Sequence, residues 1–353
     1  MSDVSDVSDL LADSVTRLFR EGSAQRTATA EFDTALWNQT QEMGLSALLV
    51  SEDQGGIGGS WEDALAVLQP AGFYAIALPV AENMLACRLL AAARLESDAV
   101  MAVAAPGEGA LQKRRQGFRF SGSFHSLPWG RNAKSIVTCV VLDETPHVVV
   151  LPSDGATLQP ATNLAGEPRD ELRFEACAAR AAPCDAPEAA QLYDFCALLR
   201  LAQVVGALDA ALTLSIDYAC ERKQFGRAIG QFQAVQQQLA LFGAEAAAVA
   251  CAVRAAFRAA TCGDAFFQIA AAKLRANMAI GPATATAHQV HAAIGFTWEH
   301  GLHHLTQRLM SWRSEFGNDR YWSERLGDAI AARGADRFWS DLTARDDAAA
   351  LVT

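Results

Sequence analysis

Residues 218–240 read YACERKQFGRAIGQFQAVQQQLA, and they constrain the architecture of this chain more tightly than any other segment. Arg222 offers a planar fork of N–H donors, and Phe225 stands directly before Gly226. On its own, ERKQFG is also typical of a helix end, where basic residues face the helix dipole and a glycine caps the last turn. The GQFQAVQQQ that follows favours a binding segment, although two of its three consecutive glutamines fit a solvated helix face.

Alanine-rich segments with helical spacing of apolar residues follow this motif and precede it. Residues 232–260 and 265–295 each predict one long helix, and a further helix begins at residue 301. Apolar residues recur around much of each helix, which is typical of a bundle buried on more than one side. We therefore predict a C-terminal four-helix bundle over residues 187–353.

The rest of the chain predicts two other domains. Residues 1–97 carry apolar residues at three- and four-residue spacing, which predicts an N-terminal helical domain. Residues 98–186 hold short runs of β-formers separated by Gly, Pro and Asp, which predict a small β-barrel-like domain. The predicted fold class is mainly α with a small β-domain. The GGIGG of residues 55–59 lacks the spacing of a phosphate-binding loop, so it is interpreted as a loop between helices, with Gly44 ending the helix before it.

Composition narrows the function classes further. The chain has 353 residues, 51% of them hydrophobic, and a formal net charge of −11, which is globular and argues against a nucleic-acid partner. Eight cysteines form no C-x-x-C pair and the N-terminus has no secretory pattern, so we expect free thiols and a cytoplasmic protein. No run approaches 18 uninterrupted apolar residues, so no membrane span is predicted. His288 and His291 could form a metal pair, but packed or solvated histidines are favoured and no metal site is predicted.

The motifs together resemble one family. Residues 218–240 are similar to the flavin-binding segment of the acyl-CoA dehydrogenases, which has an Arg, a polar residue two positions on, Phe-Gly, Phe-Gln and a further Gln. Residues 36–72 and 288–305 resemble two other segments of that family, so the resemblance runs over nearly the whole chain. It implies an N-terminal helical domain, a middle β-domain and a C-terminal four-helix bundle.

The same resemblance implies FAD as the cofactor and an acyl-CoA thioester as the substrate. Arg222 would fork onto the pyrophosphate, Phe225 would offer its flat face to a ring, and Gln233 and Gln289 would supply uncharged donors and acceptors. In the family these groups reach the FAD of a neighbouring subunit, which implies an oligomer. The predicted cofactor-binding residues are Arg222, Gln224, Phe225, Gln233, Gln289 and Ala293.

The catalytic carboxylate of the family has no clear counterpart. Family members remove the α-proton of the thioester with a glutamate, while the flavin takes the β-hydride. Counting the family spacing from Gln289 places Phe316 at the base position, before Gly317, and Glu315 one residue early. The alternative base position of the family falls on Cys196. Glu315 is therefore the one candidate catalytic residue, and the match is weak.

The flavin pocket of the middle domain also departs from the family. Only AAPGEGALQ, residues 104–112, stands where the family has a longer flavin-lining loop, and the family's Trp-x-Thr aligns with residues 126–128. The Gly-Gly pair after Gln289 is Ala292-Ala293 here, which adds methyl groups where a cofactor approaches closely.

These departures favour a subunit that completes the FAD site of a homologous catalytic chain in an α2β2 hetero-oligomer. The chain resembles the shorter subunit of bacterial steroid-type acyl-CoA dehydrogenases, which implies steroid side-chain CoA thioesters as substrates and an electron-transfer flavoprotein as acceptor. Two alternatives remain open. One is a self-sufficient homo-oligomeric enzyme that uses Glu315, and the other is a scaffold that binds acyl-CoA without oxidising it.

Overall fold

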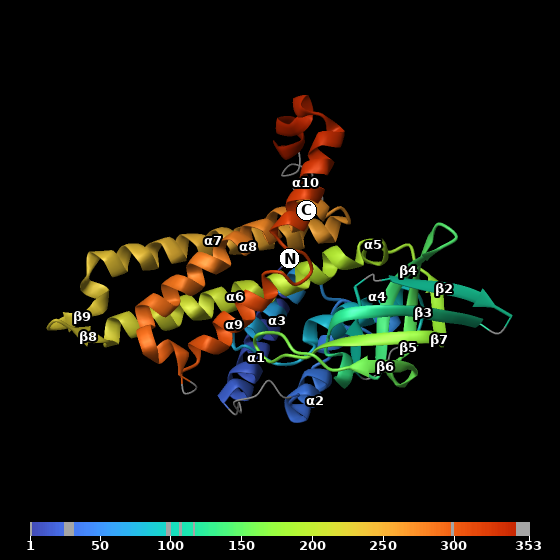
Figure 1. The fold of residues 1–353 in the computed structure, drawn as a ribbon, viewed down its shortest axis with the longest axis horizontal. Coiled ribbons are helices and arrows are strands. Elements are labelled where there is room, and N and C mark those ends of the chain that lie inside the picture. Colours follow the sequence, from blue (N-terminus) through green and yellow to red (C-terminus); the bar gives the residue numbers. More distant parts are fainter. Residues whose placement is uncertain are drawn as a thin grey trace. The chain divides into compact units, whose positions relative to one another are not determined.

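The computed structural model describes residues 2–24, 32–96, 100–105, 108–115, 117–297 and 300–343 (Figure 1). The chain divides into two compact units, which comprise residues 1–68 with 76–199 and residues 69–75 with 200–353. Helices α3 and α6 contribute residues to both units. The predicted domain boundaries at residues 97 and 186 stay predictions.

The first unit begins with four helices, α1 (Ser2–Ala24), α2 (Thr34–Glu42), α3 (Trp61–Phe73) and α4 (Val80–Ala92). Helix α2 ends as predicted, because Gly44 takes a left-handed conformation with φ 71° directly after the C-cap residue. Helix α3 begins with a reciprocal pair of bonds: the Ser60 amide donates to Asp63, and the Asp63 amide donates to the Ser60 hydroxyl. An aspartate therefore closes this capping box, where glutamate or glutamine is more common.

The glycine-rich loop before α3 uses its backbone donors internally. The amides of Gly55, Gly56, Gly58 and Gly59 donate to the carbonyls of Glu52, Ser51, Val50 and Leu48, respectively. A Cβ on Gly56 would lie 2.1 Å from the Val50 carbonyl oxygen, so only glycine fits there. Since these donors already have acceptors, the loop connects helices and is not a phosphate cradle.

A seven-stranded sheet follows in the same unit. Its strands are β1 (Met101–Val103), β2 (Glu108–Arg114), β3 (Gly117–Pro128), β4 (Ser135–Leu142), β5 (Thr145–Pro152), β6 (Ala156–Gln159) and β7 (Arg169–Pro183). The order is β1-β4-β5-β7-β3-β2, with β6 paired to β7, and β1 is parallel to β4 while the other pairs are antiparallel. Phe120 and Phe124 stack at 5.5 Å in the core, and Phe174 meets both rings edge-on. A short helix, α5 (Pro187–Ala190), follows the sheet.

Long helices make up the second unit. They are α6 (Leu192–Glu221), whose residues from 200 onward belong here, α7 (Gln233–Cys262), α8 (Phe266–His291), α9 (Leu302–Trp312) and α10 (Asp319–Arg333), together with strands β8 (Lys223–Gln224) and β9 (Arg227–Ala228). The end of α3 packs tightly on α6, because a Cβ on Gly206 would lie 1.9 Å from the Gln69 carbonyl oxygen. Gln69 also donates to Asp209 at 3.0 Å, so this crossing joins small residues with one polar pair.

The predicted helix over 265–295 is shorter in the structure. Helix α8 ends at His291, and residues Ala292–Phe296 form a 3-10 segment. The helix stops because Ala292 takes φ 52° and ψ −139°, which an α-helix cannot accommodate.

Among the described residues, α6 and α7 are long and apolar enough to pass a test for membrane spans, although the sequence predicted none. The apolar window of α6 is 89% buried within the chain, so α6 is a core helix. The window of α7 is only 28% buried, and Leu241 on this helix is 68% exposed. Helix α7 therefore leaves an apolar surface uncovered by its own chain.

Candidate functional site

The motif 218–240 folds into a tight hairpin between two helices of the second unit. Strands β8 and β9 pair through Gln224 and Arg227, and the turn between them consists of Phe225 with φ 52° and Gly226 with φ 80°. Two consecutive left-handed residues are typical of a type I′ turn, but a phenylalanine in this conformation is strained. The Phe225 side chain is 92% exposed. Its ring meets that of Phe232 edge-on, with centroids 6.2 Å apart. A strained and exposed aromatic residue is a candidate for a binding role.

Polar groups of this segment surround the hairpin. Arg222 and Gln224 are both exposed, and in its better amide orientation the Gln224 side-chain oxygen accepts from Arg222 at 2.7 Å. The Arg227 guanidinium lies 4.0 Å from the centre of the Phe232 ring, so Arg227 is engaged inside the motif. Gln236 donates to the Gly230 carbonyl and secures the loop. Arg222 is thus presented outward while its neighbours hold the hairpin together.

The end of α8 presents the remaining predicted residues. Gln289 and Ala293 are exposed. Between them, Ala292 adopts a backbone conformation that is essentially reserved for glycine. The family resemblance implies a glycine pair at Ala292 and Ala293, and the conformation of Ala292 is one that glycine adopts more readily than alanine.

These two groups of residues lie at the same end of the bundle. Tyr218, in the last turn of α6, stacks on His291, the last residue of α8, with ring centroids 4.7 Å apart. The hairpin that carries Arg222 follows α6 directly, and Figure 1 shows it at the end of the long helices. Gln233 is exposed at the first position of α7, next to the same hairpin.

The histidines near this end contact one another and other residues of their own chain. His288 contacts the Thr306 hydroxyl through Nε2 at 2.9 Å, and His303 contacts the His300 carbonyl through Nδ1 at 2.8 Å. Burial lowers the pKa of His288 and of His300, and the rings of His291 and His303 lower both further. Within the described part of the chain, no group of three His, Cys, Asp or Glu side chains could hold a metal ion.

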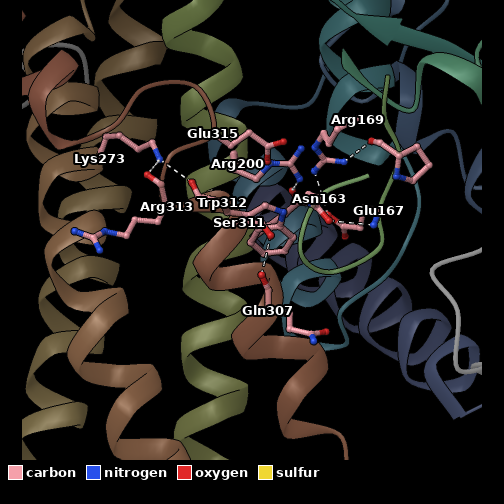
Figure 2. A network of polar contacts seen from close by, with 12 residues as sticks. Asn163, Glu167, Arg169, Arg200, Lys273, Gln307, Ser311, Trp312, Arg313 and Glu315 are labelled. Atoms are coloured by element: carbon pink, nitrogen blue, oxygen red, sulfur yellow. Dashed lines mark hydrogen bonds and ion pairs between the residues drawn. The ribbon is translucent and has the colours of Figure 1, made fainter. Parts of the chain in front are cut away.

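Glu315, the weak candidate base, lies in a different environment. Its carboxylate forms an ion pair with Arg200 of α6 at 3.0 Å, and the two side chains are 13% and 4% exposed (Figure 2). The Arg200 guanidinium also lies 5.2 Å from the Trp312 ring centre and 5.9 Å from that of Phe316. A carboxylate held by a buried guanidinium is engaged in structure, because breaking such a pair leaves a charge uncompensated.

Lys273 of α8 stabilises the turn that carries Glu315. The Lys273 ammonium is buried and donates to the Trp312 carbonyl at 2.9 Å, to the Arg313 carbonyl at 3.1 Å and to Asn277 at 3.1 Å (Figure 2). Two of these three bonds therefore cap the C-terminal end of α9, and the third stays within α8. Burial lowers the pKa of Lys273 to about 7, which Glu315 partly opposes.

The same turn has a strained backbone. Phe316, at the position expected for the base, has φ 54°, and Gly317 has φ 105°. A Cβ on Gly317 would lie 2.3 Å from Nε1 of Trp322, and this Nε1 donates to the Phe316 carbonyl at 2.9 Å. Contacts with Trp322 thus hold the turn in its strained conformation. The residue at the position expected for the catalytic glutamate is a phenylalanine.

Sequence reasoning missed Arg200 and Lys273. Arg200 is the one Lys or Arg of α6, and Lys273 is a buried lysine in the alanine-rich α8, which also carries Arg275. A charge on the apolar face of such a helix is the signal that could have identified each residue.

The alternative base position, Cys196, is buried in α6. The segment 104–112 lies partly outside the described residues, and residues 126–128 form the end of β3.

A second polar network occupies the first unit. Arg169, only 6% exposed, pairs with Glu167 at 3.1 Å, and Asn163 donates to the same carboxylate at 3.0 Å (Figure 2). The amides of Ala165 and Glu167 donate to the Asn163 side-chain oxygen, which is an Asx-type turn. This network shapes the loop before β7.

Comparison with known proteins identifies the family. Residues 194–331 match the acyl-CoA dehydrogenase, C-terminal domain. The acyl-CoA dehydrogenase IpdE2 of Mycobacterium tuberculosis is 29% identical over 286 residues, which cover 80% of this chain and 83% of IpdE2. The chain belongs to the acyl-CoA dehydrogenase family. FadE34 of the same organism is 32% identical over 314 residues, which cover 85% of this chain but only 42% of FadE34.

Solved structures of the acyl-CoA dehydrogenase fold agree. The ChsE4-ChsE5 complex from Mycobacterium tuberculosis matches with a TM-score of 0.81 at 23% identity, over 94% of this chain and 96% of that chain. The FAD complex of PigA matches with a TM-score of 0.80 at 18% identity, over 95% and 99%. At these identities the likeness concerns the fold. The predicted family, fold class and enzyme class are confirmed, and FAD is a cofactor of the family.

Proposed function

We propose that this chain is a subunit of an FAD-dependent acyl-CoA dehydrogenase and completes the FAD site of a homologous catalytic chain. The observation that carries the proposal is a contrast between two groups of residues in the second unit, the exposed cofactor segment and the paired Glu315. The residues that match the family's cofactor segment point outward at one end of the bundle, where Phe225 is 92% exposed. The carboxylate nearest the family's base position, Glu315, is engaged with Arg200.

The exposed donor set fits FAD. Arg222 can bind a pyrophosphate bidentately once it leaves Gln224, and Phe225 can lie against a ring of the cofactor. Gln233, Gln289 and the backbone at Ala293 add uncharged polar contacts. FAD would supply the acceptor for the β-hydride of the thioester, and this chain would bind and orient the cofactor.

The α-proton would be removed by a carboxylate of the partner chain. Phe316 occupies the base position here, and a phenyl ring cannot accept a proton. The uncovered apolar surface of α7 is a suitable contact for such a partner, because a 30-residue helix with only part of its surface buried favours association. The resemblance to the shorter subunit of steroid-type acyl-CoA dehydrogenases implies steroid side-chain CoA thioesters as substrates, an α2β2 assembly and an electron-transfer flavoprotein as acceptor. The fold likeness to a chain of the ChsE4-ChsE5 complex supports a partner chain for this subunit.

Flavin content tests the proposal directly. The chain purified alone should be colourless, and it should co-purify with near-stoichiometric flavin when it is expressed together with a homologous chain that carries the glutamate. In the assembled complex, Glu315→Gln should leave dehydrogenation of an acyl-CoA unchanged. Stoichiometric flavin and acyl-CoA-dependent dye reduction by the chain alone would instead support the self-sufficient enzyme.

A further inference from the structure

The cofactor-facing residues are carried by two separate elements. Arg222 and Phe225 follow the end of α6, whereas Gln289 and Ala293 stand at the end of α8. Two such groups can act on one ligand only if the helix ends are held in a fixed relation, because a displacement of about 1 Å is costly at a binding site. A contact that joins the two ends therefore bears on function.

Three aromatic rings join them. Tyr218 and His291 are stacked at 4.7 Å with 23° between their planes, and His300 meets both rings edge-on, at 6.4 Å from Tyr218 and 4.7 Å from His291. His291 is 1% exposed, and its Nδ1 lies 2.8 Å from the Ala287 carbonyl. We call Tyr218, His291 and His300 the aromatic clamp.

The residue after the clamp is strained. Ala292, with φ 52° and ψ −139°, redirects the chain from α8 toward Ala293. Such a backbone conformation persists only where the surroundings over-determine it. Gly295 helps to hold this conformation by packing closely on His291, because a Cβ on Gly295 would lie 3.0 Å from the Cβ of His291. The strained conformation of Ala292 is thus held by the aromatic clamp before it and by the close packing of Gly295 after it.

We propose that the aromatic clamp is a positioning device that sets the placement of Arg222 and Phe225 relative to Gln289 and Ala293, so that both groups meet one FAD. The proposal rests on the proposed function, because it concerns the same cofactor. Tyr218 acts through its ring face, and its hydroxyl is not required. Tyr218 and His291 are therefore positioning residues and not catalytic ones.

The test uses the full chain co-expressed with its homologous partner chain. Tyr218→Phe preserves the ring face, Tyr218→Leu preserves apolar bulk without a planar stack, and Tyr218→Ala removes both. We expect Tyr218→Leu and Tyr218→Ala to weaken FAD binding about tenfold and to alter the visible flavin spectrum, and Tyr218→Phe to match the unmodified complex. Phe257→Leu in α7, buried and outside the clamp, controls for lost stability and should leave the flavin spectrum unchanged.

Arg222→Ala separates the two proposals. If Arg222→Ala weakens FAD binding while Tyr218→Leu and Tyr218→Ala do not, the clamp is overturned and the proposed function stands. If Tyr218→Phe loses FAD as strongly as Tyr218→Ala, the hydroxyl and not the stack is responsible, which also overturns the clamp. If none of these variants, Arg222→Ala included, changes FAD binding, the proposed function fails with it.

Discussion

The hairpin end of the bundle and the turn of residues 313–318 both match segments of acyl-CoA dehydrogenases, but their side chains are used in opposite ways. At the hairpin end, Arg222 and Phe225 are exposed, and few contacts of their own chain engage them. At the turn, Glu315 pairs with Arg200, and Lys273 donates to two carbonyls of the α9 terminus. Both regions contain strained residues with positive φ, Phe225 and Phe316.

This difference separates a binding role from a structural one. Substitutions in the turn should change the stability of the chain, because they leave buried charges or carbonyls without partners. Substitutions at the hairpin end should change cofactor binding and leave stability nearly unaltered, because those side chains are solvated. The predictions below test this separation.

The largest effect concerns the pH dependence of stability at Lys273. Its pKa is about 7 in the folded protein and 10.5 ordinarily, so between these values the unfolded chain binds a proton that the folded chain does not. The free energy of unfolding should therefore rise with pH from about 7 to 10.5, by at most about 5 kcal/mol. Denaturant titrations across this range measure it. Lys273→Met should lack the slope, and equal slopes in the two proteins would contradict the buried ammonium.

The Arg200–Glu315 pair should contribute the next largest effect. Glu315→Ala leaves the Arg200 guanidinium buried without its carboxylate and should lower the free energy of unfolding by about 3 kcal/mol. Glu315→Gln preserves shape and one hydrogen-bond acceptor, so it should cost less. Urea denaturation of both variants distinguishes them. An unchanged midpoint for Glu315→Ala would show that this carboxylate is not engaged in structure.

Arg222→Ala should weaken FAD binding without changing stability, the reverse of the effect expected in the turn. We expect FAD binding in the assembled complex to weaken about thirtyfold, the equivalent of about 2 kcal/mol, because a bidentate charged contact is lost. The melting temperature of the chain alone should not change. Lys223→Ala, next to it on the hairpin and also exposed, is the matched control. Loss of stability without loss of FAD would reverse the roles assigned to the two regions.

The smallest effect is expected at Ala292. Ala292→Gly should raise the free energy of unfolding by about 1 kcal/mol, because glycine adopts this conformation without strain. Ala293→Gly is the control, since Ala293 is exposed and is not among the residues with positive φ, so glycine there should be neutral or destabilising. Thermal unfolding measures both variants. Destabilisation by Ala292→Gly would mean that its backbone strain is not relieved in this way.

Local patterns predicted the elements well where one residue decides the conformation. Gly44 ends α2, as predicted, because glycine tolerates positive φ. Patterns failed where partners decide. The alanine-rich residues after Cys177 are not β-formers, whereas β7 continues through them to Pro183 and pairs there with β5. Alanine has little intrinsic preference for a strand, so the neighbouring strand supplies the reason.

The sequence by itself determined the family, the helical and β segments and the hairpin motif, because these depend on residues that are close along the chain. Only the tertiary structure decided what Glu315 and Lys273 do. The partner of Glu315, Arg200, comes from another helix, and Lys273 meets backbone carbonyls that carry no signature in the amino-acid sequence. The charge of such a residue is visible in the sequence, but its energetic role depends on burial and on distant partners, which the fold alone brings together.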